Sequence, residues 1–183
     1  RSQEKWTQGL AATKKLPASI PGVTKAWYFC YFNSKLENWQ ESVDHAEAVL
    51  TVDPTFYSAS TYMAYGLEHL RQKTKAQSIY RALTKSYPGE SYAFISLAYL
   101  LAGENKIEEA QLVLNDAIEK GHDSKRIKNL ESLLFKAKHG PKWDRVFVWK
   151  SRHYEIRTDI DKETAQQAAK VLEQAHTAYS AYL

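Results

Sequence analysis

The sequence predicts a mainly α-helical solenoid that ends in a short β element and one further helix. The 183 residues include only seven glycines and five prolines, too few for the turns of a many-stranded fold. A different pattern, rich in alternating β-branched and aromatic residues, starts only at Trp143. The third observation is a small residue followed by tyrosine that recurs every 34 residues, as Cys30-Tyr31, Ala64-Tyr65 and Ala98-Tyr99.

Composition narrows the class of protein. Hydrophobic residues make up 44% and charged residues 25%, which are globular values, and no stretch approaches the roughly 20 apolar residues of a membrane helix. One cysteine excludes an internal disulfide framework. The chain begins at Arg1 and ends within a helical pattern, so we expect it to be trimmed at both ends. Cytoplasm and bacterial periplasm both stay open as compartments.

Further columns of residues share the period of 34, and self-similarity at a fixed period is the signature of a repeat architecture. The columns are Pro54 and Pro88; Ser42, Ala76 and Ala110; Ala46, Tyr80 and Leu114; and Val49, Leu83 and Ala117.

Each period contains two predicted helices. Asn38 is a predicted N-cap, and Asp53-Pro54 is a second one with proline at the first helical position. Each helix has about three turns and is too short to be stable alone, so each pair must bury its apolar face against the next pair. The predicted helices cover 25–36, 39–51, 55–70, 73–86, 90–102 and 106–119.

Two further segments flank these pairs. Residues 1–22 are predicted to form an N-terminal helix and linker. The stretch "SKRIKNLESLLFKAKHG" is amphipathic, so residues 123–140 should form a capping helix that ends at Gly140-Pro141.

The 34-residue helix-turn-helix unit resembles the tetratricopeptide repeat. In that family the eighth and twentieth places of the repeat are small, as the columns beginning at Cys30 and Ser42 are here, and a proline closes the unit. His122 takes the place of that proline in the third unit, and Ala26 stands where the first unit would have an aromatic residue. The resemblance covers residues 23–122 and implies three repeats in a right-handed superhelix.

The resemblance also implies a binding surface. In the family, the first helix of each unit lines the concave face, and the residue after the small one points into the groove. The expected function is therefore a scaffold that binds a partner protein or peptide, without the lysine and asparagine set that captures a C-terminal carboxylate. The alternative is that these rings only pack between helices. The implied groove residues are Trp27, Tyr31, Thr61, Tyr65, Glu68, Tyr92, Ile95 and Tyr99.

The sequence contains no pattern that indicates catalysis. Cys30 with His45 could be a nucleophile and its base, but Cys30 fills the small-residue column and should be buried and inert. The six histidines lack metal-ligand spacing, and no glycine-rich phosphate loop is present. We therefore expect no enzyme, no metal and no cofactor.

The C-terminal segment, 141–183, is predicted to be a second, incomplete domain. Residues 144–159 indicate one long strand, or two short ones meeting near Ser151-Arg152. Asp161 should cap the following helix. The helix has one apolar stripe, which with a strand or hairpin cannot build an independent core. The stripe comprises Ala165, Ala168, Ala169, Leu172, Ala175, Tyr179 and Tyr182.

"SRHYEIRTD" followed by an alanine-rich helix resembles the opening of peptidase-MA-like domains, a zinc-metallopeptidase-like group of bacterial proteins often joined to tetratricopeptide repeats. This second resemblance implies an alternative function, the non-catalytic N-terminal part of such a protein. The family's His-Glu-x-x-His helix is not in this sequence. No catalytic residue is therefore carried over.

The net charge of +4 is unevenly spread. Between residues 120 and 145, eight Lys or Arg residues oppose three acidic ones, which gives +5. Such a patch could bind nucleic acid or acidic lipid, but it lacks the interleaved aromatic residues of a single-strand binder. We interpret it as a solvated helix face and expect no nucleic-acid partner.

Overall fold

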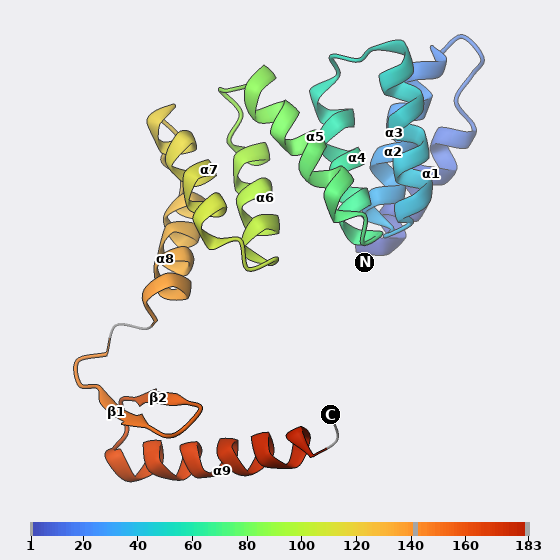
Figure 1. Ribbon diagram of the computed structural model, residues 1–183. Coiled ribbons are helices and arrows are strands. Elements are labelled where there is room, and N and C mark those ends of the chain that lie inside the picture. The colour runs from blue at the N-terminus through green and yellow to red at the C-terminus, as the bar shows by residue number, and fades with distance from the viewer. Residues whose placement is uncertain (1, 141–142, 182–183) are drawn as a thin grey trace. The chain divides into compact units, whose positions relative to one another are not determined.

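The computed structural model describes residues 2–140 and 143–181 and divides the chain into two compact units, Arg1–Lys138 and His139–Leu183. The first unit is helical, and the second contains a two-stranded hairpin and one helix (Figure 1). This confirms the predicted fold class. Pro141, the predicted helix terminator, and Tyr182, a predicted stripe residue, lie outside the described residues.

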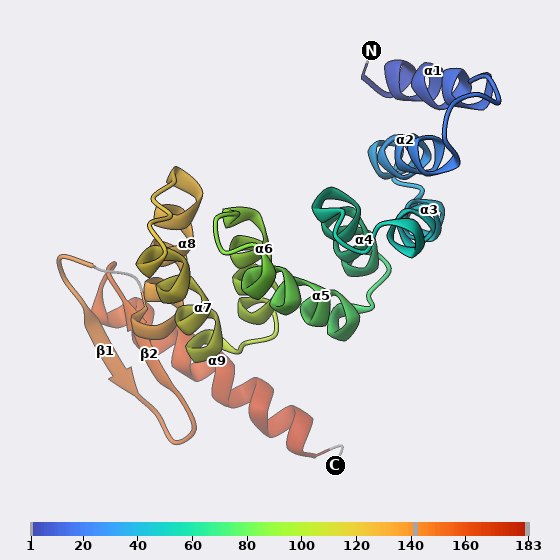
Figure 2. The same cartoon turned by 90° about the horizontal axis from the view of Figure 1, so that it is seen from above.

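The predicted helix pairs are present, each within about three residues of its expected ends. In chain order, the first unit has helices α1 (Ser2–Lys14), α2 (Gly22–Lys35), α3 (Trp39–Val52), α4 (Tyr57–His69), α5 (Lys73–Ser86), α6 (Ser91–Ala102), α7 (Ile107–Glu119) and α8 (Lys125–His139). The helices of this unit follow an arc, with α2, α4 and α6 on its inner side and α3, α5 and α7 on its outer side (Figure 2).

Two predicted caps differ from the structure. Asp53-Pro54 does not start α4. Instead, the Asp53 carboxylate accepts hydrogen bonds from the Thr55 backbone N–H at 3.0 Å and the Thr55 hydroxyl at 2.6 Å, which forms a turn, and the helix begins later. Asn38 does stand at the N-cap of α3, but its amide donates to Asn33 Oδ1 at 3.0 Å and makes no cap hydrogen bond.

The small-residue columns lie where helices cross. Cys30, Ser42 and the four alanines at the corresponding places in the next two repeats are all fully buried. The Ser42 hydroxyl donates to the Cys30 carbonyl at 3.0 Å, which joins the two helices of the first pair. A Cβ at Gly66 would lie 2.6 Å from Val43 Cγ2, so α3 and α4 also approach too closely for a larger residue.

The same period appears in the backbone. Glu37, Arg71 and Asn105, each 34 residues apart, have φ values of 63°, 62° and 60°. Each lies between the two helices of one repeat, and the following N–H bonds back to a carbonyl of the first helix, as Gln72 does to Leu67 at 2.9 Å. The left-handed residue therefore ends the first helix and turns the chain into the second.

Hydrogen bonds also join successive repeats. The Tyr87 hydroxyl donates to the Thr55 carbonyl at 2.6 Å. His122 Nε2 lies 2.8 Å from the Pro88 carbonyl oxygen, and its ring is 5.5 Å from that of Phe94. His122 replaces the proline expected at this place, and it makes a polar contact that proline could not make. Beyond it, α8 buries Ile127, Leu130 and Leu134 in the core of this unit.

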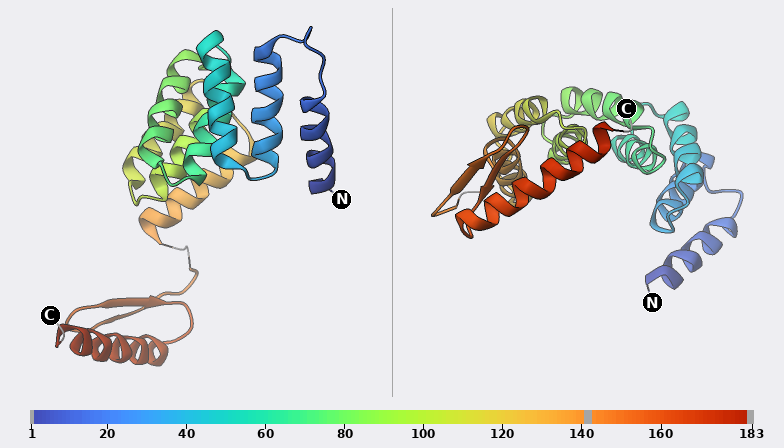
Figure 3. Two further views of the ribbon diagram at one scale, coloured as in Figure 1. Left: turned by 90° about the vertical axis from the view of Figure 1, so that its right-hand side faces the viewer. Right: turned by 60° about the horizontal axis from the view of Figure 1, so that its bottom comes forward.

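In the second unit, strands β1 (Phe147–Lys150) and β2 (Glu155–Thr158) pair antiparallel, with Trp149 opposite Ile156. The hairpin is thus the correct one of the two predicted alternatives. Helix α9 (Lys162–Ser180) lies along the hairpin (Figure 3) and contacts both strands. Asp161 caps α9 as predicted, since its carboxylate accepts from the Thr164 N–H at 2.6 Å.

Candidate functional site

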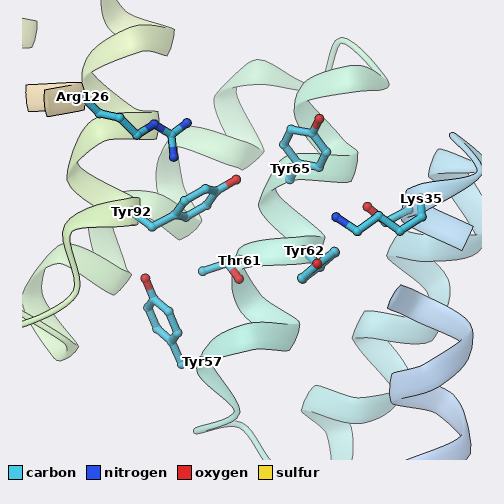
Figure 4. A pocket seen from close by; sticks show the side chains of 8 residues that line it. Lys35, Tyr57, Thr61, Tyr62, Tyr65, Tyr92 and Arg126 are labelled. Carbon is cyan, nitrogen blue, oxygen red and sulfur yellow. The ribbon is translucent and has the colours of Figure 1, made fainter. Parts of the chain in front are cut away.

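An open pocket of about 380 Å³ lies on the inner side of the repeat arc, among α2, α4, α6 and α8. Four tyrosine rings and one threonine form its walls, and one cation enters from each side (Figure 4). The lining residues are Ser34, Lys35, Tyr57, Thr61, Tyr62, Tyr65, Tyr92 and Arg126.

Helix α4 supplies half of this lining. Residues three or four apart lie on one face of an α-helix, so Tyr57, Thr61 and Tyr65 point the same way and Tyr62 stands beside them. Ala64 on the same helix is fully buried against its neighbours. One face of α4 therefore packs in the core and an adjacent face presents tyrosines.

The hydroxyls of Tyr57, Tyr62 and Tyr65 remain protonated at neutral pH. Burial raises the pKa of Tyr57 to about 12 and that of Tyr62 to about 12, and burial also raises the pKa of Tyr65. Within the described residues, the buried Tyr57 hydroxyl makes no hydrogen bond of ordinary geometry. The pocket thus holds neutral hydroxyl donors, and Tyr57 has unused hydrogen-bonding capacity.

An aromatic cluster continues from the pocket toward the N-terminus. Trp27 lies 5.2 Å from Phe56 and 5.4 Å from Tyr62, measured between ring centroids. Tyr31 lies 5.8 Å from Tyr62. Lys35 Nζ stands over two of these rings, 5.3 Å from Tyr31 and 5.7 Å from Tyr62. Cation–π attraction therefore orients this lysine at the pocket's edge.

The sequence-predicted groove residues fall into four places. Thr61, Tyr65 and Tyr92 line the pocket. Trp27 and Tyr31 contact it through Tyr62. Glu68 and Tyr99 line a second hollow with His69 and Lys73. Ile95 is only 3% exposed and belongs to the hydrophobic core.

Sequence reasoning missed several lining residues. Tyr57 and Tyr62 could have been found, because they lie four and three residues before Thr61 and Tyr65, on the same helix face. Lys35 follows Tyr31 by one helical turn and could have been found in the same way. No pattern in the sequence pointed to Arg126, because only the packing of α8 brings it to this pocket.

The second hollow holds a carboxyl group in partly buried surroundings. Burial raises the pKa of Glu68, while the nearby His69 and Lys73 charges act in the opposite direction. The His69 ring stacks on Trp39 with centroids 3.9 Å apart and planes within 8°. The hollow is therefore mixed in charge, unlike the tyrosine pocket, whose lining has two cations and no carboxylate.

Other features bear on chemistry. Cys30 is buried, as predicted, and burial raises the pKa of its thiol to about 11, so it is a poor nucleophile. Among residues 2–140 and 143–181, no group of three or more His, Cys, Asp or Glu side chains could hold a metal ion. None of the helices described is long and apolar enough to span a membrane.

Two lysines of the basic segment, residues 120–145, form ion pairs. Lys120 pairs with Asp116, and Lys128 pairs with Asp123 at 2.8 Å. Both lysines stand on exposed helix ends, where such pairs contribute little to stability.

No protein-family profile and no curated protein matches the sequence, but solved structures match its fold. MamA RS-1, as the ArsTM double mutant, is 15% identical with a TM-score of 0.65, over 98% of this chain and 90% of that one. YrrB, a tetratricopeptide-repeat protein with an unusual peptide-binding site, is 18% identical with a TM-score of 0.63, over 72% and 68%.

A third match is a tetratricopeptide-repeat protein from Parabacteroides merdae, which is 18% identical with a TM-score of 0.60. It is matched over 74% of this chain, which spans about half, 52%, of its length. The chain has the tetratricopeptide-repeat fold. At these identities the likeness shows the fold alone.

Proposed function

We propose that this chain is a protein-interaction module that binds a peptide or an extended segment of a partner protein on the inner side of its repeats. The observation that carries the proposal is the tyrosine-lined pocket. Tyrosine combines apolar area with a hydroxyl donor and has few rotatable bonds, which makes it a frequent hot-spot residue in interfaces. YrrB, which shares the fold, has an unusual peptide-binding site.

The binding surface in this proposal extends beyond the pocket. Tyr65 and Tyr92 supply its centre, Trp27 and Tyr31 its N-terminal side, and Glu68 and Tyr99 its neighbouring hollow. Thr61 is 7% exposed and Ile95 3% exposed, so their role in this proposal is to position the rings around them. The tyrosines, which remain half-buried or exposed, offer the contact area.

Selection from a phage-displayed library of random dodecapeptides tests the proposal. Peptides that bind the 183-residue chain are synthesised, and their affinities are compared between the wild type and the variants Tyr65→Ala and Tyr92→Ala. We expect each variant to weaken binding by about 1–2 kcal/mol, as for interface hot spots. Tyr28→Ala is the matched control, because Tyr28 is 42% exposed on α2 but does not line the pocket.

Circular dichroism on each variant checks that it remains folded. The proposal is wrong if the selected peptides bind Tyr65→Ala and Tyr92→Ala as well as they bind the wild type. It is also wrong if Tyr28→Ala weakens binding as much as the pocket variants do. The variant Tyr99→Ala then asks whether the second hollow belongs to the same surface.

A second candidate function concerns the C-terminal unit, which we propose as the non-catalytic leading part of a metallopeptidase-like protein. Large apolar side chains on this unit are exposed, with Val146 at 45%, Val171 at 62% and Tyr179 at 75%. Such side chains favour a further layer of structure against them. Hydrogen exchange of residues 143–181, measured in this chain and in a longer natural chain, tests the idea. Equal protection in both would contradict it.

A further inference from the structure

The charge of the pocket lining narrows the class of partner. Lys35 and Arg126 enter from opposite sides, and each directs its charged end toward the tyrosine rings (Figure 4). Among the residues that the structure describes, neither side chain makes an ion pair, whereas lysines on neighbouring surfaces such as Lys106 and Lys128 do. The pocket therefore presents two positive charges that are not held in ion pairs within the described residues.

The polar groups between the two cations suit the same chemistry. The hydroxyls of Tyr57, Tyr62 and Tyr65 are neutral donors. A carboxylate accepts hydrogen bonds from hydroxyl, ammonium and guanidinium donors and has no proton to donate at neutral pH. A lining made of hydrogen-bond donors and positive charges binds a carboxylate, which only accepts hydrogen bonds, better than it binds an amide or an ammonium group.

The nearest acidic groups stand outside the lining. Glu90 acts on Tyr57, and Glu37 and Glu68 act on Tyr65, each by raising the pKa of the tyrosine through its negative charge. Their negative charge disfavours an anion next to Tyr57 or Tyr65. An acidic ligand is therefore best placed with its carboxylates at Lys35 and Arg126.

We infer that the inner pocket binds an extended acidic segment of a partner protein, with one Asp or Glu side chain directed to Lys35, another to Arg126, and the intervening residues on the tyrosine rings. The inference rests on the proposed function and names the chemistry of its partner. One carboxylate cannot engage cations on opposite sides of the pocket, so the segment must present two, and we assign both to side chains of an internal segment. The rings provide the stacking and apolar area between the two charges.

Two phage libraries of random dodecapeptides test this. One displays peptides without a free C-terminus, and the other displays them with a free one. We expect the wild-type chain to enrich Asp and Glu in the first library, and the double variant Lys35→Gln/Arg126→Gln to lose that enrichment. For a synthetic peptide from the first library, each single variant should weaken binding about three- to fivefold, as for partly exposed ion pairs. Raising the salt to about 0.3 M should weaken it further.

Lys136→Gln is the matched control. It removes one positive charge from α8, the helix that carries Arg126, but Lys136 itself does not line the pocket. Enrichment of neutral or basic peptides whose binding requires Tyr65 and Tyr92 would overturn the acidic partner but keep the proposed function. Acidic enrichment only in the library with free C-termini would also overturn the inference. Loss of all tyrosine dependence would overturn both proposals.

Discussion

The repeats and the C-terminal unit are held together by different forces. In the repeats, buried apolar side chains run from Val43 in α3 to Leu134 in α8 as one core cluster. In the described part of the C-terminal unit, only Ala165 and Ala169 are buried. That unit relies more on polar contacts, because Glu173 of α9 accepts hydrogen bonds from Ser151 Oγ and from the backbone N–H of His153, both at 2.7 Å.

The difference follows from the size of each unit. Each repeat helix is short, but stacking gives it neighbours on two sides. Its apolar face is therefore buried in a core that continues through several repeats. A hairpin of two four-residue strands with one helix has no such neighbours and too little apolar area for a core of its own. Its order therefore depends on a few specific hydrogen bonds.

The largest effect should come from overpacking a helix contact in the repeats. Ala98 is fully buried where α6 crosses its neighbours, so Ala98→Leu should lower the free energy of unfolding by about 1–3 kcal/mol. Urea denaturation measures the change. Ala82→Leu, on the exposed face of α5, is the control and should be nearly neutral. Equal stability of both variants would mean that the core tolerates volume at the small-residue column.

A smaller, local effect is expected in the C-terminal unit. Hydrogen bonds from His153 and Ser151 hold the pKa of the Glu173 carboxyl at about 2, below its usual range. This carboxylate therefore stabilises the folded unit above its unfolded pKa, about 4.3, and the contribution is lost as the pH falls from there toward 2. The protection factors of β1 and β2, which correct the exchange rates for their intrinsic dependence on pH, should then fall several-fold, while those of the repeat core change less.

Glu173→Gln should lower the same protection factors at neutral pH, because the amide loses the charge that strengthens these hydrogen bonds. Glu163→Gln, on the exposed N-terminal turn of the same helix, is the matched control. If both variants exchange like the wild type, the contacts of Glu173 do not hold the hairpin on α9, and the contrast between the two units lies in burial alone.

Much of the repeat architecture could be predicted because it is periodic. The small-residue columns at Cys30 and Ser42 identify helix contacts directly, and the structure buries them. The start of α4 could not be placed, since Asp53-Pro54 is equally typical of a helix cap and of a turn. One long strand and a hairpin of two short strands have the same alternating pattern of residues in the sequence. Only the pairing of Trp149 with Ile156 in the structure distinguishes them.

The candidate site was only partly accessible to the same reasoning. Helical spacing identifies Thr61 and Tyr65 as neighbours on α4, and the same rule extends to Tyr57 and Tyr62. Arg126 depends on how α8 packs after the last repeat, which no local pattern encodes. Ile95 matches the spacing of a groove residue but lies in the core, because α6 is apolar on almost every side.

The smallest predicted effect belongs to the turns within the repeats, and it is a gain of stability. Arg71 has a φ of 62°, a conformation that costs a residue with a Cβ about 1 kcal/mol more than it costs glycine. Arg71→Gly should therefore raise the free energy of unfolding by about 0.5 kcal/mol, the remainder being offset by the greater backbone freedom of glycine in the unfolded chain. Gln72→Gly is the control. Gln72 has a φ of −84°, where a Cβ causes no strain, so this substitution should lower stability. The equivalent change at Glu37 should add a similar gain and that at Asn105 a smaller one, because asparagine tolerates this conformation well. The gains should add, since the three turns lie in separate repeats. Thermal unfolding of the triple variant measures the sum, and a midpoint at or below that of the wild type would show that the left-handed turns carry no strain that the repeats must offset.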